Sequence, residues 1–110
     1  MSYTLHITRA AEQDIGDAAD YIEVVLKNPD AADRLLDAVT EIVSALAISP
    51  EIYPVVDDPV LRSWGIRFIT VKNYLAFYTI DDENRTIYIV RFLYNKRDWH
   101  TILGQGIDFS

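Results

Sequence analysis

The sequence has 110 residues, 50% of them hydrophobic, and a formal net charge of −7. It contains no cysteine, which excludes disulfide bonds and thiolate metal ligands and suits a reducing cytoplasm. The acidity disfavours indiscriminate binding to nucleic acid, and no apolar run approaches the roughly 20 residues that a membrane helix requires. We therefore expect a single cytoplasmic domain over residues 1–110, without a membrane anchor.

The charge is distributed unevenly along the chain. Residues 1–60 contain 3 Lys and Arg against 12 Asp and Glu (3 − 12 = −9), whereas residues 61–110 contain 7 against 5 (7 − 5 = +2). Within the second half, basic and aromatic residues gather between Tyr94 and His100. Such a cluster in an acidic chain indicates a surface that meets something anionic or planar.

The first half of the sequence predicts a strand and two helices. Tyr3 to Ile7 alternates apolar and polar residues, as a strand with one buried face does. Apolar residues then recur at helical spacing from Ala10 to Leu26, with Thr8 as the cap, and again from Ala32 to Leu46. Asn28-Pro29 ends the first helix and begins the second. We expect these helices to form an antiparallel hairpin.

The second half predicts strands after an irregular crossover at residues 51–62. Three runs rich in aromatic and β-branched residues are separated by turn-like segments, and they are Trp64–Val71, Tyr74–Ile80 and Thr86–Leu93. The predicted class is α+β with the order β-α-α-β-β-β, in which the N-terminal hairpin packs on one face of an antiparallel sheet. The other face should stay partly open, and Arg67 and Arg91 are expected to point there.

Several short motifs in this order resemble the RelE/ParE superfamily of toxins from bacterial type II toxin-antitoxin modules. The similarity extends from about Tyr3 to Leu103, and its motifs are Ala10 to Ile15, Tyr21-Ile22, Asn28-Pro29 with Ala31-Ala32, Gly65 to Arg67, Asn73 to Tyr78 and Ile89 to Trp99. The resemblance implies a plasmid-stabilisation toxin neutralised by a cognate antitoxin, in a hetero-oligomeric complex. It leaves the target open, because the superfamily includes both inhibitors of DNA gyrase and ribosome-dependent mRNA endonucleases.

An endonuclease needs cations around the phosphate and groups that transfer protons. Arg67, Lys96 and Arg97 are the available cations, and Tyr74, Tyr94 and His100 are the available proton-transfer groups. Position by position, the resemblance to the RelE-like branch implies a catalytic role for Arg97 and a phosphate-binding role for Arg67. Together with Tyr94, which lies beside the basic cluster, they are the catalytic candidates. In the YoeB-like branch a catalytic His stands where this sequence has Leu93, so the acid–base set is incomplete.

A gyrase inhibitor needs only an exposed surface with aromatic and Arg anchors. The ending of the sequence, with Arg91, Tyr94 and Arg97, resembles ParE-like sequences, and this reading is slightly favoured. The candidates for binding the target or the antitoxin are Arg67, Arg91, Tyr94, Lys96, Arg97 and Trp99. For Trp99 we favour packing, together with Ile102 and Leu103, in a short amphipathic turn docked on the sheet; for Tyr74 and Tyr78 we favour ordinary packing in a strand.

The remaining expectations concern ligands and partners. His6 and His100 are far apart and lack paired carboxylates at ligand spacing, so neither a metal nor a cofactor is expected. An antitoxin segment should lie between the hairpin and the sheet, with acids opposite Arg67, Arg91 and Arg97. Reversing the charge of Arg91 and Arg97 should weaken toxicity without unfolding the domain. A non-toxic binding module is the third alternative.

Overall fold

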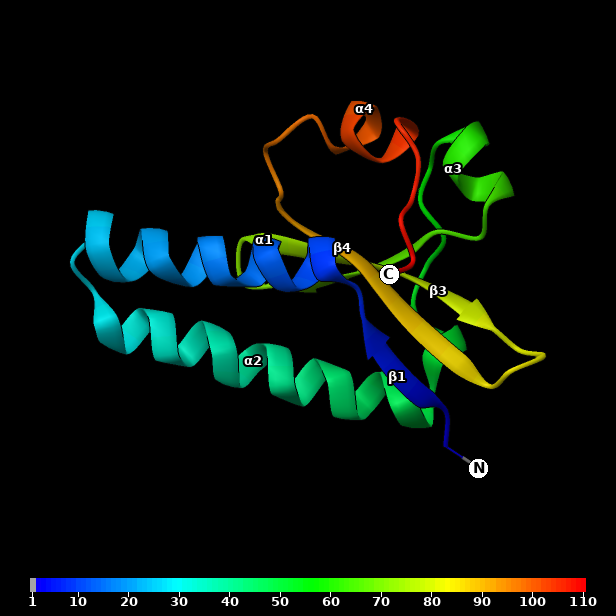
Figure 1. Ribbon diagram of the computed structural model, residues 1–110, viewed down its shortest axis with the longest axis horizontal. Helices are drawn as coiled ribbons and strands as arrows, with labels where there is room; N and C mark the ends of the chain where they lie inside the picture. The colour runs from blue at the N-terminus through cyan, green and yellow to red at the C-terminus, as the bar shows by residue number, and fades with distance from the viewer. Residues whose placement is uncertain (1) are drawn as a thin grey trace.

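The computed structural model describes residues 2–110 and places a helical hairpin against a four-stranded sheet (Figure 1). The chain begins with β1 (Thr4–Ile7) and continues through α1 (Arg9–Asp20) into a π-helical turn (Tyr21–Val25). It then reverses and returns along α2 (Pro29–Ile48). The predicted hairpin is confirmed. Among the described residues, no helix is both long and apolar enough to cross a membrane.

Both predicted helix starts are confirmed by their caps. The Thr8 hydroxyl accepts a hydrogen bond from the Ala11 N–H at 3.2 Å, and the Asn28 side chain accepts one from the Ala31 N–H at 3.1 Å. Pro29 occupies the first turn of α2, where its missing N–H costs no intrahelical bond. Local sequence therefore determines where each helix of the hairpin begins.

The sheet is mixed, with strand order β1-β4-β3-β2. β2 (Arg67–Val71), β3 (Tyr74–Asp81) and β4 (Thr86–Tyr94) form the predicted antiparallel meander. β1, however, pairs with β4 in parallel, so the sheet is not antiparallel throughout. Parallel neighbours cannot be joined by a tight turn, and here the helical hairpin, the crossover, β2 and β3 all lie between β1 and β4 in the chain.

The hairpin covers one face of the sheet. Ala18 of α1 and Leu35 of α2 pack in one cluster with residues of β2, β3 and β4. Ala11 of α1 and Leu46 of α2 pack in a second cluster with Tyr78 of β3 and with two isoleucines of β4. The apolar stripes predicted for the two helices are therefore the surfaces that they bury.

The opposite face is also covered, so the expected open face is wrong. The crossover contains a 3-10 turn (Pro50–Ile52) and α3 (Pro59–Ser63), and the chain ends with α4 (Trp99–Gly104). α3, α4 and the residues beside them enclose a third buried cluster of Val56, Leu61, Ile66, Phe77, Val90, Leu93 and Leu103. The 3-10 turn lies on the hairpin side, where the Pro50 carbonyl accepts the Tyr78 hydroxyl. The strands carry apolar residues on both faces, and the second set requires its own cover.

Candidate partner-binding groove

A groove of about 860 Å³ opens between the hairpin and the ends of the β-strands. Its walls come from α1, the π-helical turn and α2 on one side, and from the β2–β3 turn, the end of β4 and the segment after it on the other. Apolar and aromatic side chains make up about half of its lining residues, and they are Ala18, Tyr21, Ile22, Leu26, Ala31, Leu35, Tyr74, Phe92 and Tyr94. A concave, largely apolar site of this size is typical of a binding site.

Three aromatic rings pack together along the sheet side of the groove. Tyr74 stacks on Phe92, with ring centroids 5.0 Å apart and planes inclined by 12°, and meets Tyr94 edge-on at 5.7 Å. Tyr74 and Tyr94 are directly opposite in the antiparallel pairing of β3 and β4. The register of the sheet thus fixes this aromatic wall.

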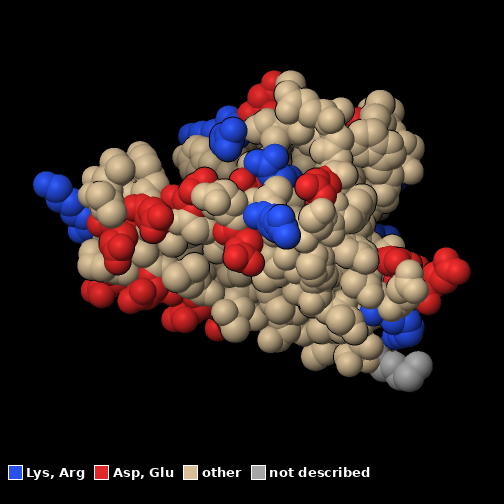
Figure 2. Space-filling model, viewed as in Figure 1, with Lys and Arg blue, Asp and Glu red and all other residues tan. Residues whose placement is uncertain are grey.

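Three cations from three separate elements line the same groove. Arg34 comes from α2, Lys72 from the β2–β3 turn and Arg97 from the segment after β4; all are exposed, and none forms a salt bridge with another described residue. Figure 2 shows acidic side chains gathered over the hairpin and a group of Lys and Arg above α1. The groove is therefore locally basic on an acidic protein.

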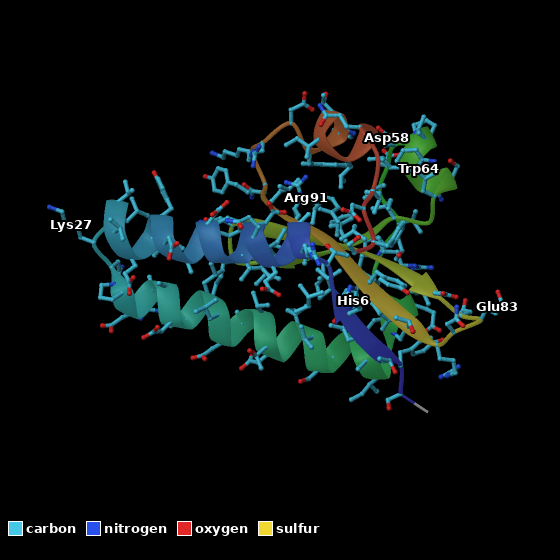
Figure 3. All side chains as sticks on the ribbon, in the orientation of Figure 1. His6, Lys27, Asp58, Trp64, Glu83 and Arg91 are labelled. Atoms are coloured by element: carbon cyan, nitrogen blue, oxygen red, sulfur yellow. The ribbon has the colours of Figure 1, made fainter. Side chains whose placement is uncertain are left out.

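The two acids in the groove are already engaged. Asp14 accepts hydrogen bonds from Arg91 Nε at 2.6 Å and Nη2 at 3.0 Å, and Asp17 accepts one from the Gln13 amide at 2.8 Å. The bond to Asp14 raises the pKa of Arg91 above its ordinary value. Arg91, expected on an open face as a contact for a target, is thus paired within the protein, between α1 and β4 (Figure 3).

The tyrosines of β3 hold their protons tightly. Burial raises the pKa of Tyr74, and its neighbours Tyr94 and Tyr21 raise it further. Burial also raises the pKa of Tyr78 to about 12, and its hydroxyl donates a 2.6 Å hydrogen bond to the Pro50 carbonyl. The packing role expected for Tyr78 is confirmed, since its side chain is fully buried.

A family model described as the ParE toxin of the type II toxin-antitoxin system, parDE, matches residues 5–99. The chain belongs to the ParE toxin family. The predicted membership of the RelE/ParE superfamily is therefore confirmed. No curated protein matches the sequence.

Two solved structures share the fold of this ParE-family chain. The RelBE2 toxin-antitoxin complex from Mycobacterium tuberculosis contains a chain with 25% identity and a TM-score of 0.62, and the match covers 86% of this chain and 99% of that one. The chromosomal ParDE system from P. aeruginosa contains a chain with 22% identity and a TM-score of 0.67, and the match covers 84% and 96%. Their likeness confirms the predicted α+β toxin fold.

Arg67 lies outside the groove and binds backbone instead. Its Nη1 donates to the Tyr53 carbonyl at 2.6 Å and to the Glu51 carbonyl at 3.2 Å. Along β2, Arg67 has the same side-chain direction as Ile69 and Val71, which pack toward the hairpin. The expectation that it points to an open face is wrong, and its visible role is to hold the crossover against the sheet.

Trp99 and His100 take part in the packing of α4. Trp99 lies against Phe77 with ring centroids 5.2 Å apart and stacks on His100 at 3.7 Å. His100 Nδ1 lies 3.0 Å from Asp58 Oδ2, which joins α4 to the start of α3. The packing interpretation of Trp99 is confirmed, and this residue does not line the groove.

Of the six predicted binding residues, Tyr94 and Arg97 line the groove, and Lys96 is exposed beside them. The sequence did not point to Tyr21, Arg34, Lys72 or Phe92, which also line it. Arg34 and Lys72 belong to segments without a cluster of basic residues, and only the fold brings them to one place. Within the described residues, no three His, Asp or Glu side chains come together to hold a metal ion.

Proposed function

We propose that this ParE-family toxin inhibits DNA gyrase through a surface at the end of β4, formed by Tyr94, Lys96 and Arg97. The observation that carries the proposal is the exposure of these three neighbouring residues: Tyr94 is 39% exposed, and both cations are exposed. Tyr and Arg contribute a large share of the binding energy of protein interfaces. Such a surface needs no group that transfers protons. The proposal implies action in the cytoplasm.

The candidate endonuclease groups have other engagements, which favours binding over catalysis. To act as a base, Tyr74 would have to be deprotonated. Burial raises the pKa of its hydroxyl, which makes deprotonation near neutral pH less favourable. His100 is held by Asp58, and Arg67 donates to backbone carbonyls. The resemblance of the sequence to the RelE-like branch keeps an mRNA endonuclease as the second candidate, with Arg97 and Tyr94 as its reactive groups.

The proposed partner in the cell is a cognate antitoxin that binds in the groove. Both solved structures that resemble the chain are of toxin-antitoxin systems. A segment that orders on binding can cover a large surface and silence it. The resulting complex would be hetero-oligomeric.

Purified protein tests the proposed target directly. Added to DNA gyrase and relaxed plasmid, it should inhibit supercoiling, and in cells it should leave mRNA intact while inducing the DNA-damage response. Cleavage of mRNA on translating ribosomes, abolished in Arg97→Ala, would instead establish the endonuclease. Expression without any effect on growth would leave the non-toxic binding module.

A further inference from the structure

Two of the three residues of the proposed target surface, Lys96 and Arg97, lie on a short exposed segment. Residues 95–98 are all exposed, and they join the end of β4 to α4 (Figure 1). The sheet fixes the start of this segment, because the Asn95 N–H donates to the Asn73 carbonyl at 2.9 Å. The other end leads directly into α4, so the docking of α4 helps to determine where the two cations lie.

Two kinds of contact attach α4 to the rest of the protein. Leu103 is fully buried and the Trp99 ring lies against Phe77, so apolar packing keeps the helix on the sheet without any charge. His100 stacks on Trp99 with ring centroids 3.7 Å apart, and its Nδ1 lies 3.0 Å from Asp58 Oδ2. Asp58 is the cap of the neighbouring helix, α3 (Figure 3). This polar link between α3 and α4 is the contact whose strength can change.

The charge on this link depends on His100. With Nδ1 facing the carboxylate, the neutral ring donates its Nδ1 hydrogen, and a proton taken up from water goes to Nε2 and makes the ring a cation. The ordinary pKa of an imidazole is about 6.5, so a histidine can respond to pH changes near neutrality. The charged groups that act on the ring are Asp58 and Asp98, the caps of α3 and α4. Hydrogen bonds from Leu61 and Thr101 hold the pKa of these carboxyl groups below the ordinary value of 3.8, so both stay ionised.

Resting on the proposed function, we propose that His100 and Asp58 form a proton-sensitive clasp that positions Lys96 and Arg97 for the target. When the ring is charged, its attraction to the carboxylate holds the first turn of α4 against α3 and steadies residues 95–98. When the ring is neutral, the hydrogen bond remains but the charge attraction is lost, so the segment moves more freely and must be ordered on binding. The side chains of His100 and Asp58 are 50% and 22% exposed, so the clasp changes the affinity by a small factor and does not act as an on-off switch.

Three variants separate the charge of the clasp from its packing. His100→Arg keeps a flat group that can stack on Trp99 and carries a charge at every pH, as the protonated histidine does. His100→Phe keeps a stacking ring without a charge or a hydrogen bond. Asp58→Asn keeps a side chain that caps α3 and removes the negative charge. His6→Phe is the matched control, because His6 is the other histidine of the sequence and lies on β1.

The first measurement does not involve gyrase. Backbone order parameters of residues 95–98, from NMR relaxation, should be higher at about pH 6 than at about pH 7.5 in the wild type. They should stay high in His100→Arg and low in both His100→Phe and Asp58→Asn, whereas His6→Phe should behave like the wild type. Order parameters that do not change with pH in the wild type, or that change equally in His100→Phe, would overturn the clasp.

The second measurement is the affinity of each variant for gyrase relative to the wild type at the same pH, a ratio that cancels the pH dependence of gyrase itself. His100→Arg should bind like the wild type at about pH 6 and about threefold more tightly at about pH 7.5. Asp58→Asn should bind about threefold more weakly at about pH 6 and like the wild type at about pH 7.5. Ratios that are the same at both pH values would overturn the positioning role. If the wild type does not bind gyrase, the proposed target fails, whereas the order parameters still decide whether the clasp exists.

Discussion

Arg91 and Asp14 form a two-point ion pair, with Nε 2.6 Å from Oδ2 and Nη2 3.0 Å from Oδ1. The same carboxylate accepts the Phe92 N–H at 3.0 Å. β1 ends at Ile7, opposite Ile89, so this edge of β4 has no strand neighbour beyond that point among residues 2–110. Asp14 accepts one N–H of that edge, where a neighbouring strand would otherwise accept it, and it joins α1 to the strand that leads into the proposed target surface.

Removal of this carboxylate should destabilise the fold. Asp14→Ala leaves Arg91 and an edge N–H without their partner, and we expect a loss of about 1–3 kcal/mol in the free energy of unfolding. The partial exposure of Arg91, 28% of its side chain, keeps the loss below that of a fully buried pair. Urea denaturation measures the change, with the exposed Asp20→Ala as control. Equal stability of the two variants would show that the pair contributes nothing.

Tyr78 should limit stability at alkaline pH. Because its pKa is raised from 10.0 in the unfolded chain to about 12 in the fold, its contribution is complete below pH 10 and is lost as the pH rises toward 12. Two pKa units correspond to about 2–3 kcal/mol.

Tyr78→Phe removes the titrating group, together with the hydrogen bond to Pro50. The variant should be less stable than the wild type at neutral pH by about 1 kcal/mol, and this difference should shrink or reverse near pH 12. Chemical denaturation at a series of pH values measures this difference in the free energy of unfolding. A difference that stays constant with pH would contradict the assignment.

Asp58 should contribute to the way the stability of the fold decreases at acidic pH. Its pKa lies below the ordinary value of 3.8 because the carboxylate accepts the Leu61 N–H and a hydrogen bond from His100. A carboxylate with a lowered pKa stabilises the fold above its unfolded pKa, and this stability disappears as the pH falls through the folded pKa. Asp58→Asn should therefore flatten the fall of Tm between about pH 5 and about pH 2 relative to the exposed control Asp57→Asn. An equal fall of Tm with pH in the two variants would contradict this prediction.

Local patterns predicted most of the fold, and contacts between distant segments explain the rest. Thr8 and Asn28 mark the helix starts because a cap acts within three residues. Asp14 and Arg91 are 77 positions apart, so no local pattern shows that they pair. Arg91 stands out in the sequence only as a cation, and whether a cation is free or paired depends on the fold. Tyr94 and Arg97 were predicted because they lie in one basic and aromatic cluster of the sequence. Arg34 lies far from that cluster in the sequence and reaches the groove only in the folded protein.

Loss of the exposed aromatic side chain at the groove should weaken the inhibition of gyrase, whereas loss of one elsewhere on the surface should not. Tyr94→Ala removes an anchor from the proposed target surface, and we expect the concentration needed for half-inhibition of gyrase supercoiling to rise more than tenfold. Trp64→Ala is the matched control, because Trp64 is 43% exposed and lies at the end of α3, outside the groove (Figure 3). Similar losses in both variants would indicate a general effect of removing aromatic surface.

Charge reversal should separate Arg97 from Arg91, which the sequence alone treats as equivalent. Arg91→Glu places a second carboxylate against Asp14, and like charges at this distance should lower Tm and the yield of folded protein. Arg97→Glu changes an exposed residue without a salt bridge among the described residues, so it should weaken toxicity at an unchanged Tm.

The expectation that both reversals leave the fold intact is therefore revised for Arg91. Asp14→Arg/Arg91→Glu restores opposite charges, and it should recover part of the Tm lost in Arg91→Glu. Melting curves for the four proteins, with growth arrest measured in parallel, decide the matter. If Arg91→Glu melts like the wild type, or if Arg97→Glu loses toxicity only by unfolding, the separate roles of the two arginines are wrong.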